Sequence, residues 1–171
     1  MLRYAAGEVA AFSELYQRHK DHLYRFVLGS VGDAGAAEEV AQDTWEAVLG
    51  AATRYTDSAA FTTWLFTIAR RKLVDHYRRT ERSGATQAEA AVEDLVAAVH
   101  EGPERQLQSH QLLALIAQLP PDQGQALLLK EEGFSMRQIA DIVEAGEETV
   151  KSRIRYARSS LRSSLGVGDE H

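Results

Sequence analysis

Two stretches of the chain combine residue types that bind nucleic acids. Residues 70–82 hold six basic residues against two acidic ones, and they directly follow a run that contains Phe61 and Trp64. Aromatic rings beside cations suit single-stranded nucleic acid, because bases stack on the rings while the cations hold the phosphates. Residues 149–165 hold five basic residues and no acidic one. Although the net charge is −6, its distribution favours two separate contacts with anionic partners.

Each stretch also has a purely structural interpretation. Phe61, Trp64 and Ile68 recur at helical spacing, which favours core positions for Trp64 and Ile68 and leaves Tyr77 undecided. The neighbouring basic residues would then only solvate a helix end. Residues 149–165 likewise fit a solvated amphipathic helix with one basic face.

Metal binding and catalysis are the other chemistries to consider. His19 and His22 lie three residues apart with Glu14 and Asp21 near, which could hold a metal, but a solvated helix face is the favoured interpretation. His76 lies among arginines and suits nucleic acid better than a metal. The chain has no cysteine, and it shows no phosphate loop, nucleophile elbow or paired carboxylates. We therefore expect no enzyme, no cofactor and no metal.

The hydrophobic pattern predicts an all-α fold. Apolar residues recur at three- and four-residue steps, and no segment alternates as a strand would. We predict a first helix that ends at Gly29 and Gly32, and a break with an N-cap at residues 56–58. Further helices are expected over about 34–53, 59–79, 103–119, 125–132, 136–143 and 147–165.

The charge and composition change between residues 83 and 108. This stretch holds five acidic residues and one basic residue, and it opens with small polar side chains. Such a composition predicts a flexible acidic linker between two small helical domains. No run approaches the roughly 20 apolar residues of a membrane helix, and no secretory signal is visible, so we expect a cytoplasmic protein without membrane insertion.

Residues 135–158 have the geometry of a helix-turn-helix. Ile139 and Val143 on the first helix, and Val150 and Ile154 on the second, would face inward. The residues expected to point outward are Thr149, Lys151, Ser152, Arg155 and Tyr156. A helix of this kind fits the major groove of duplex DNA.

Five ordered segments resemble the extracytoplasmic-function (ECF) sigma factors of bacterial RNA polymerase, in the sigma-70 superfamily. The opening, with Gly7-Glu8, Ala11-Phe12 and Leu15-Tyr16, is similar to theirs. Residues 37–45 resemble their core-binding segment, and Phe61–Leu65 with 68–79 resembles their promoter-melting segment. Leu119-Pro120 with Ile139-Ala140, and then residues 149–153, resemble their second domain. The resemblance covers about residues 7–165 in the right order.

The resemblance implies a region 2 domain over 1–82, a linker over 83–104 and a region 4 domain over 105–171. Positions matching the segment that captures the opened −10 strand are Arg54, Tyr55, Phe61, Trp64, Arg70, Arg71, Lys72, His76, Tyr77, Arg78 and Arg79. Positions matching the core-polymerase contact are Glu38, Glu39, Gln42, Asp43 and Glu46. Positions matching the −35 duplex contact are Thr149, Lys151, Ser152, Arg153, Arg155, Tyr156 and Arg158.

The implied partners are core RNA polymerase, through its largest-subunit coiled coil and its flap, promoter DNA and an anti-sigma protein. We expect a monomer when the chain is free. Three positions depart from the family pattern: Glu148 and Glu144 stand where glycine is common, and Tyr156 stands where arginine is common. Glu144 would be strained if the turn is left-handed there, unless Gly146 supplies that conformation. Two other functions stay open: a stand-alone helix-turn-helix regulator of transcription, and a helical metal-dependent hydrolase using His19 and His22.

Overall fold

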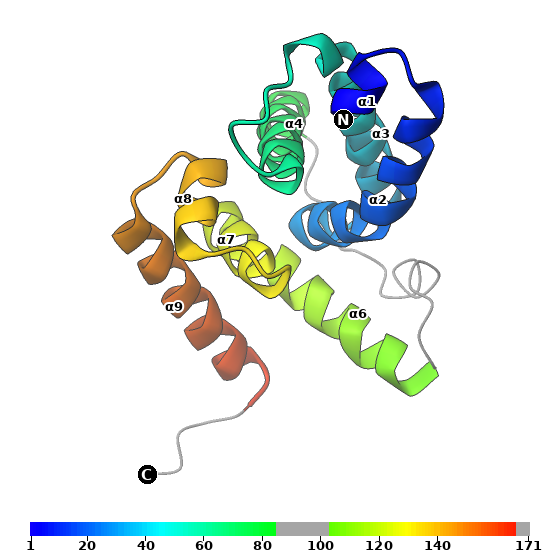
Figure 1. Cartoon of the computed structure of the whole chain (residues 1–171). Coiled ribbons are helices and arrows are strands. Elements are labelled where there is room, and N and C mark those ends of the chain that lie inside the picture. Colours follow the sequence, from blue (N-terminus) through cyan, green and yellow to red (C-terminus); the bar gives the residue numbers. More distant parts are fainter. Residues whose placement is uncertain (85–102, 167–171) are drawn as a thin grey trace.

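The computed structural model describes residues 1–84 and 103–166, and within those ranges the chain is helical with no strand (Figure 1). The all-α prediction is confirmed. The helices are α1 (Leu2–Ala5), α2 (Val9–Val31), α3 (Ala34–Gly50), the 3₁₀ helix η1 (Ala52–Arg54), α4 (Phe61–Ser83), α6 (Pro103–Ala117), α7 (Pro121–Glu131), α8 (Met136–Val143) and α9 (Glu147–Ser164). Most of the predicted linker, 83–104, and of the tail after Gly166 lies outside the described residues.

The first helical group, residues 1–84, is named the N-module. Its helices α2, α3 and α4 pack pairwise and bury apolar residues that recur at helical spacing, such as Leu23, Val40 and Leu65. The prediction that α2 ends at Gly29 is wrong, because the helix runs on to Val31 and Gly32 caps it with φ 72°. The next residue, Asp33, accepts a hydrogen bond from the Ala36 backbone N–H at 2.7 Å and so starts α3.

The loop between η1 and α4 also differs from the prediction. No side chain caps the start of α4, which begins at Phe61 after Ala60, so the N-cap expected at residues 56–58 is wrong. The Thr56 and Ser58 hydroxyls instead lie 3.0 Å from each other within the loop. The loop therefore leaves Tyr55 and Phe61 to be fixed by ring contacts rather than by a cap.

The second helical group, residues 103–166, is named the C-module. Ser135 and Gln138 form a reciprocal capping box at the start of α8. Val150 and Ile154 are buried on α9 against the rest of the group, as the helix-turn-helix prediction requires. The turn after α8 places Glu144 at φ 55° and ψ 48°, while Gly146 has φ −71°. Glu144 itself therefore takes the left-handed conformation.

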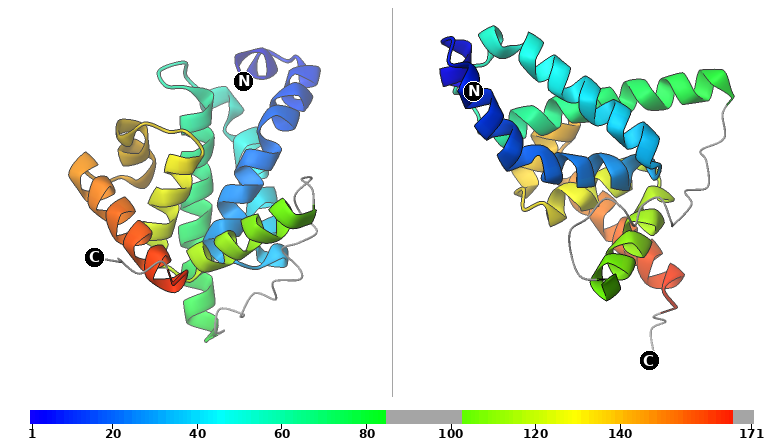
Figure 2. Two further views of the ribbon diagram at one scale, coloured as in Figure 1. Left: turned by 90° about the horizontal axis from the view of Figure 1, so that it is seen from below. Right: turned by 90° about the vertical axis from the view of Figure 1, so that its right-hand side faces the viewer.

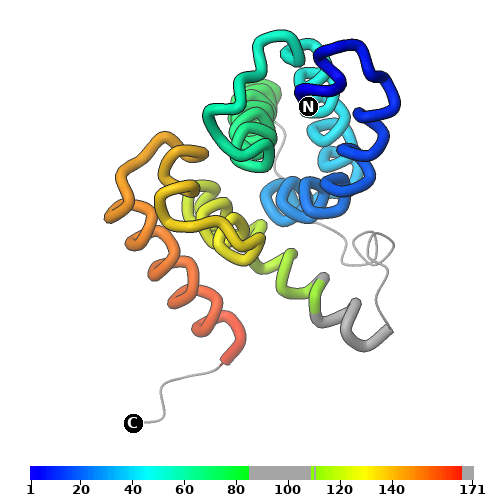
Figure 3. The backbone as a smooth tube through the Cα atoms, in the orientation of Figure 1, coloured from blue at the N-terminus to red at the C-terminus, as the bar shows by residue number. Residues whose placement is uncertain are grey.

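The two modules pack against each other, an arrangement that the sequence analysis did not predict. Helix α8 lies on α4, while α6 and α7 lie on α2 (Figure 2, Figure 3). One hydrophobic core runs through both, and Phe66 on α4 joins them because its ring centroid is 5.3 Å from Phe26 and 5.0 Å from Phe134.

Gly29 permits the closest approach between the modules. A Cβ atom at this position would lie 2.8 Å from Leu128 Cδ2 and 3.0 Å from Leu113 Cδ2, and both of those leucines belong to the C-module. A side chain on residue 29 would therefore push α7 and α6 away from α2. This role explains a glycine inside a long helix, where glycine is otherwise unfavourable by roughly 1 kcal/mol relative to alanine.

Candidate nucleic-acid and polymerase interfaces

An aromatic cluster forms where α4 begins. The ring centroid of Tyr55 is 4.9 Å from that of Trp64 and 6.1 Å from that of Phe61, and the Phe61 and Trp64 rings are 5.9 Å apart. All three residues are partly buried, so they are neither fully in the core nor fully in solvent. Arg54 is exposed beside them. The cluster places aromatic rings beside a cation, the combination that single-stranded nucleic acid binds.

His19 belongs to the same cluster, although the sequence analysis considered it only as a solvated residue or a metal ligand. Its ring centroid lies 5.2 Å from that of Phe61. Burial lowers the pKa of His19, and the nearby His22 and Arg18 lower it further. The spacing on α2 gave no signal for this contact, because Phe61 is on a different helix.

The basic residues of α4 separate into two groups along the helix. Arg70 and Arg71 lie at the contact with the C-module, where their Nη2 atoms are 3.8 Å from Asp122 and 3.4 Å from Glu144. Arg78 is exposed and Arg79 lies 3.6 Å from Glu39 and 3.8 Å from Asp43 of α3. The last turns of α4 extend past the neighbouring helices (Figure 2). The structure therefore does not bring all predicted −10 residues into one surface.

Tyr77 is partly buried where the N-module meets α7 of the C-module. Its hydroxyl donates a hydrogen bond to the Ser30 carbonyl at 2.8 Å, and its ring packs against the hydrophobic core. Burial raises the pKa of Tyr77, so the phenol stays neutral. The His76 ring centroid is 6.0 Å from that of Tyr77. In this conformation Tyr77 positions the end of α4, and stacking on its ring would require a rearrangement.

The acidic residues of α3 border a groove between α3 and α2. Glu38 and Gln42 line it together with Tyr16, Lys20, Asp21, Tyr24, Ala41 and Trp45, and its volume is about 410 Å³. Gln42 donates a hydrogen bond to Glu46 at 3.1 Å. Glu38, Glu39, Gln42 and Glu46 are exposed, and Asp43 is partly buried. The predicted polymerase-binding residues thus share one face, and that face joins the basic end of α4 through Arg79.

Helix α9 presents most of its predicted DNA contacts to solvent. Residues on its outer side that are exposed are Thr149, Lys151, Arg155, Tyr156 and Arg158, and Ser152 is partly buried. The guanidinium of Arg155 lies over the Tyr156 ring, 5.2 Å from its centroid. Glu148 contacts the Lys151 ammonium at 2.6 Å and raises the pKa of Lys151 by this hydrogen bond and its charge. Lys151 is thus held by an in-chain carboxylate beside the predicted groove contacts.

Arg153 differs from its neighbours on α9 because it turns toward α7. Its Nη2 donates to Asp122 at 3.1 Å, and its side chain is only 22% exposed. The same Asp122 carboxylate faces Arg70 of α4, so one acidic side chain lies between the two predicted DNA-binding helices. Two guanidinium nitrogens here, Arg70 Nε and Arg153 Nη1, are buried without a hydrogen-bond partner.

Within residues 1–84 and 103–166, no group of three or more His, Cys, Asp or Glu side chains is arranged to hold a metal ion. His22, one of the two histidines considered for that role, pairs with Glu132 instead. No described helix is both long and apolar enough to cross a bilayer.

Family models match both modules. The Sigma-70 region 2 model matches residues 15–83, and the Sigma-70, region 4 model matches residues 109–161. The RNA polymerase sigma-H factor of Pseudomonas aeruginosa is 31% identical over 95% of this chain and 90% of its own length. The ECF RNA polymerase sigma factor SigL of Mycobacterium tuberculosis is 33% identical over 94% of this chain and 92% of its own length.

Two solved structures share the fold. The sigma factor RpoE in complex with the anti-sigma factor NepR, from Bartonella quintana, superposes with a TM-score of 0.76 at 24% identity over 92% of this chain and 98% of its own. CnrH in complex with the cytosolic domain of CnrY gives a TM-score of 0.71 at 22% identity over 96% of this chain and 94% of its own. At this level of identity the likeness concerns the arrangement of the helices alone.

Proposed function

The chain belongs to the ECF RNA polymerase sigma factors of the sigma-70 family, and on that premise we propose a division of work between its two modules. As a member of this family, it is a transcription initiation factor and not an enzyme. It binds core RNA polymerase, recognises the −10 and −35 elements of a restricted promoter set and promotes DNA melting. The stand-alone regulator and the metal-dependent hydrolase are thereby set aside.

The −10 strand is assigned to the aromatic cluster and the cations of α4. The ring centroids of Tyr55, Phe61 and Trp64 lie between 4.9 and 6.1 Å from one another. Arg54 is exposed beside them. Taking a base out of the duplex costs a few kcal/mol, and stacking returns roughly 1–3 kcal/mol per base. This aromatic cluster, beside a basic helix, is the observation on which the −10 assignment rests.

The core polymerase contact is assigned to the exposed face of α3 and its groove. Glu38, Glu39, Gln42, Asp43 and Glu46 present carboxylates and an amide to one side. The −35 duplex is assigned to the outer side of α9, where Thr149, Lys151, Ser152, Arg155, Tyr156 and Arg158 lie together, with Arg153 joining them if it leaves Asp122. Two weak DNA contacts on one tethered chain reinforce each other through effective concentration.

Reconstitution with purified core polymerase tests this division. Genomic fragments selected by the holoenzyme supply the promoter, and the readouts are core binding, binding to the −35 duplex and run-off transcription. Trp64→Ala is expected to reduce melting without weakening core binding. Asp43→Arg is expected to abolish core binding while the −35 contact of the chain stays intact. Asp141→Asn is a matched control on an exposed acid of α8 outside these three sets. Loss of core binding in the Trp64 variant would contradict the division.

A protein antagonist is also proposed. The structurally similar RpoE and CnrH were each solved with such a partner, an anti-sigma factor NepR and the cytosolic domain of CnrY. Because RNA polymerase works in the cell interior, the chain acts there, and the bacterial cytoplasm is the proposed location. Purification of the native complex from cells, followed by identification of a stoichiometric partner, tests the proposal. Recovery of the chain with core polymerase alone, before and after stress, would contradict it.

A further inference from the structure

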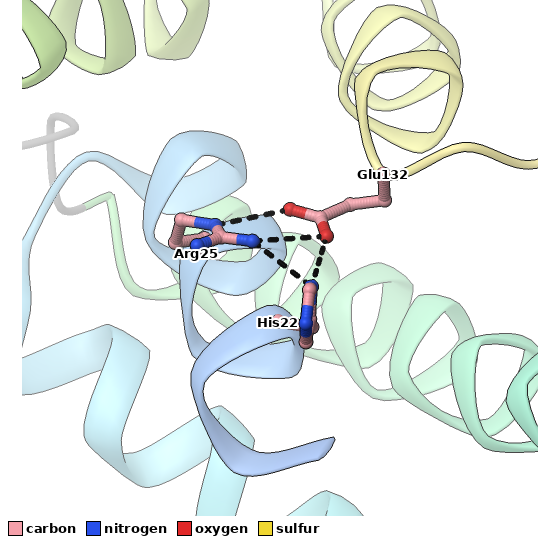
Figure 4. Close-up of polar contacts among 3 residues, drawn as sticks. All are labelled: His22, Arg25 and Glu132. Carbon is pink, nitrogen blue, oxygen red and sulfur yellow. Dashed lines mark hydrogen bonds and ion pairs between the residues drawn. The ribbon is translucent and has the colours of Figure 1, made fainter. Parts of the chain in front are cut away.

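The C-module places a carboxylate into a cationic site on α2. Glu132 lies at the end of α7, and both of its carboxylate oxygens face Arg25, with Nε–Oε1 and Nη2–Oε2 distances of 3.2 Å (Figure 4). His22 Nδ1 lies 2.7 Å from Oε2. Arg25 Nη2 lies 2.9 Å from the same Nδ1, so this ring nitrogen lies between the guanidinium and the carboxylate. A guanidinium fork of this kind binds carboxylates and phosphates alike.

The position of Glu132 is unfavourable unless the N-module supplies cations. Its side chain is only 11% exposed, so its charge has lost most of its water. It also caps the C-terminal end of α7, where the helix dipole is negative and repels a carboxylate. The Arg25 guanidinium offsets both penalties, and His22 lies beside the same carboxylate. The Glu132 carboxylate is therefore stabilised by the site on α2, whereas its own helix in the C-module disfavours it.

The same polarity holds for the other ion pairs between the modules. Arg70 faces Asp122 and Arg71 faces Glu144, so in each described pair the N-module supplies the cation and the C-module the carboxylate. Arg70 and Arg71 are already assigned to the opened −10 strand. The described ion pairs on the N-module surface that the C-module covers are thus made by cations of the N-module, and the α2 site is one of them.

A strand on the aromatic cluster would pass close to the α2 site. His19 contacts Phe61 of the cluster at 5.2 Å and lies one turn before His22 on α2. Between them and the C-module is a cavity of about 220 Å³ lined by Arg18, His19, His22, Thr62, Phe66, Glu132 and Phe134. Phe66 and Phe134 make one side of the cavity aromatic, and it reaches from His19 of the cluster to His22, which lies beside Arg25.

We propose that His22 and Arg25 form a binding site for a backbone phosphate of the promoter strand, and that Glu132 occupies this site while the two modules are in contact. The proposal rests on the −10 role given to the N-module above. It follows that the opened strand reaches the site only after the C-module moves off α2. Glu132 then acts as an in-chain competitor of the DNA phosphate.

The competition is tested on the free full-length chain. The probe is a fluorescein-labelled oligonucleotide carrying the non-template −10 strand of a promoter selected by the holoenzyme, and its anisotropy is measured at low salt. Glu132→Gln should bind it about tenfold more tightly than the natural chain, since a charged hydrogen-bond acceptor has been removed. The matched control is Glu131→Gln, because Glu131 is exposed and pairs with Arg158 inside the C-module. Equal affinities in these two variants would overturn the competition.

The phosphate site itself is tested in the holoenzyme. Arg25→Gln should weaken binding of the same oligonucleotide and reduce the dependence of log affinity on log salt by about 0.7, the value of one single-strand phosphate. Arg25→Lys keeps the charge and should restore the salt dependence. If Arg25→Gln leaves both affinity and salt dependence unchanged, Arg25 is not a phosphate ligand.

A second way of separating the modules keeps the test independent of Glu132. Gly29→Leu clashes with Leu113 and Leu128 of the C-module and should raise the radius of gyration in solution scattering. In that background the oligonucleotide should bind tightly and Arg25→Gln should weaken it. If Trp64→Ala weakens binding but Arg25→Gln does not, the α2 site is wrong and the −10 assignment stands. If neither weakens binding, the −10 assignment is wrong as well.

Discussion

Helices α9 and α4, the two predicted DNA-binding helices, differ in how much of their predicted DNA-binding face is exposed to solvent. Helix α9 turns Thr149, Arg155 and Tyr156 to solvent. Helix α4 faces α8 instead, and its Arg70 and Arg71 lie beside carboxylates of the C-module. The packed arrangement therefore leaves the proposed −35 helix accessible while it covers part of the proposed −10 helix.

The difference follows from the kind of DNA that each helix is proposed to bind. A duplex reader needs an outward helix face that enters a groove, which one helix can offer without rearrangement. A single-strand reader needs exposed rings and cations, and such a surface is itself apolar and charged enough to attract another part of the chain. Covering that surface until promoter DNA is present limits unspecific contact with nucleic acid.

The shared core is the strongest link between the modules, so its removal has the largest expected effect. Phe66 is 2% exposed and contacts one phenylalanine from each module. Phe66→Ala should lower the free energy of unfolding by about 4 kcal/mol, because it leaves a cavity in both contacts. Urea denaturation followed by circular dichroism measures this value. Tyr156→Ala, at a 54% exposed position, should stay within about 0.5 kcal/mol of the natural chain. Similar values for both variants would show that the modules do not share a core in solution.

Asp122 is the carboxylate that lies between α4 and α9, the two helices proposed to bind DNA. Its replacement by alanine leaves the guanidinium groups of Arg70 and Arg153, which are 19% and 22% exposed, without the acid that faces both. We expect a loss of about 1–2 kcal/mol in unfolding free energy, less than for a fully buried pair because Asp122 is half exposed. Asp141→Ala on α8, an exposed acid without a described ion pair, is the control. No difference between the two would mean that Asp122 does not couple α4 to α9.

Much of the fold follows from local patterns in the sequence, but the packing of the modules does not. The apolar steps on α9, the capping residues Ser135 and Gln138 and the break at Gly32 are local signals, and they place the elements correctly. The contact between Gly29 and Leu128 joins residues far apart in the chain, and no spacing rule reveals it. The expected N-cap at residues 56–58 fails because ring contacts and not a polar cap fix this loop.

The candidate site was predicted by residue type more than by position. The aromatic residues near the start of α4 come together as expected for a stacking surface, and His19 joins them from α2. Tyr77 is also aromatic and partly buried, but its hydroxyl donates a hydrogen bond to the Ser30 carbonyl and its ring packs against the core. Composition shows which chemistry is present, whereas burial by other helices decides which of those side chains is free.

The ion pair of Glu148 and Lys151 tests the accessible helix α9. Lys151→Ala should weaken binding to the −35 duplex about fivefold, the effect of one phosphate or base contact, and leave core binding unchanged. Glu148→Gln should do the opposite, since it releases the ammonium from a contact at 2.6 Å and removes a charge that repels phosphate. Both are measured by anisotropy with a labelled duplex. Weaker binding by Glu148→Gln would indicate that Glu148 accepts a hydrogen bond from a base, as a cytosine amine would offer.

Glu144 gives the smallest expected effect and separates backbone strain from the contact between modules. It is the one non-glycine residue with positive φ in the described ranges, and its carboxylate lies 3.4 Å from Arg71 with both side chains more than 60% exposed. An exposed pair of this kind contributes little, so Glu144→Gln should change stability by less than about 0.5 kcal/mol. Glu144→Gly removes the same charge and also relieves the left-handed conformation, so it should be more stable than Glu144→Gln by about 1 kcal/mol. Urea denaturation of the two variants side by side gives that difference directly. If the glycine variant is the less stable one, the turn is not left-handed in solution, and the approach of α8 to α4 would need another explanation.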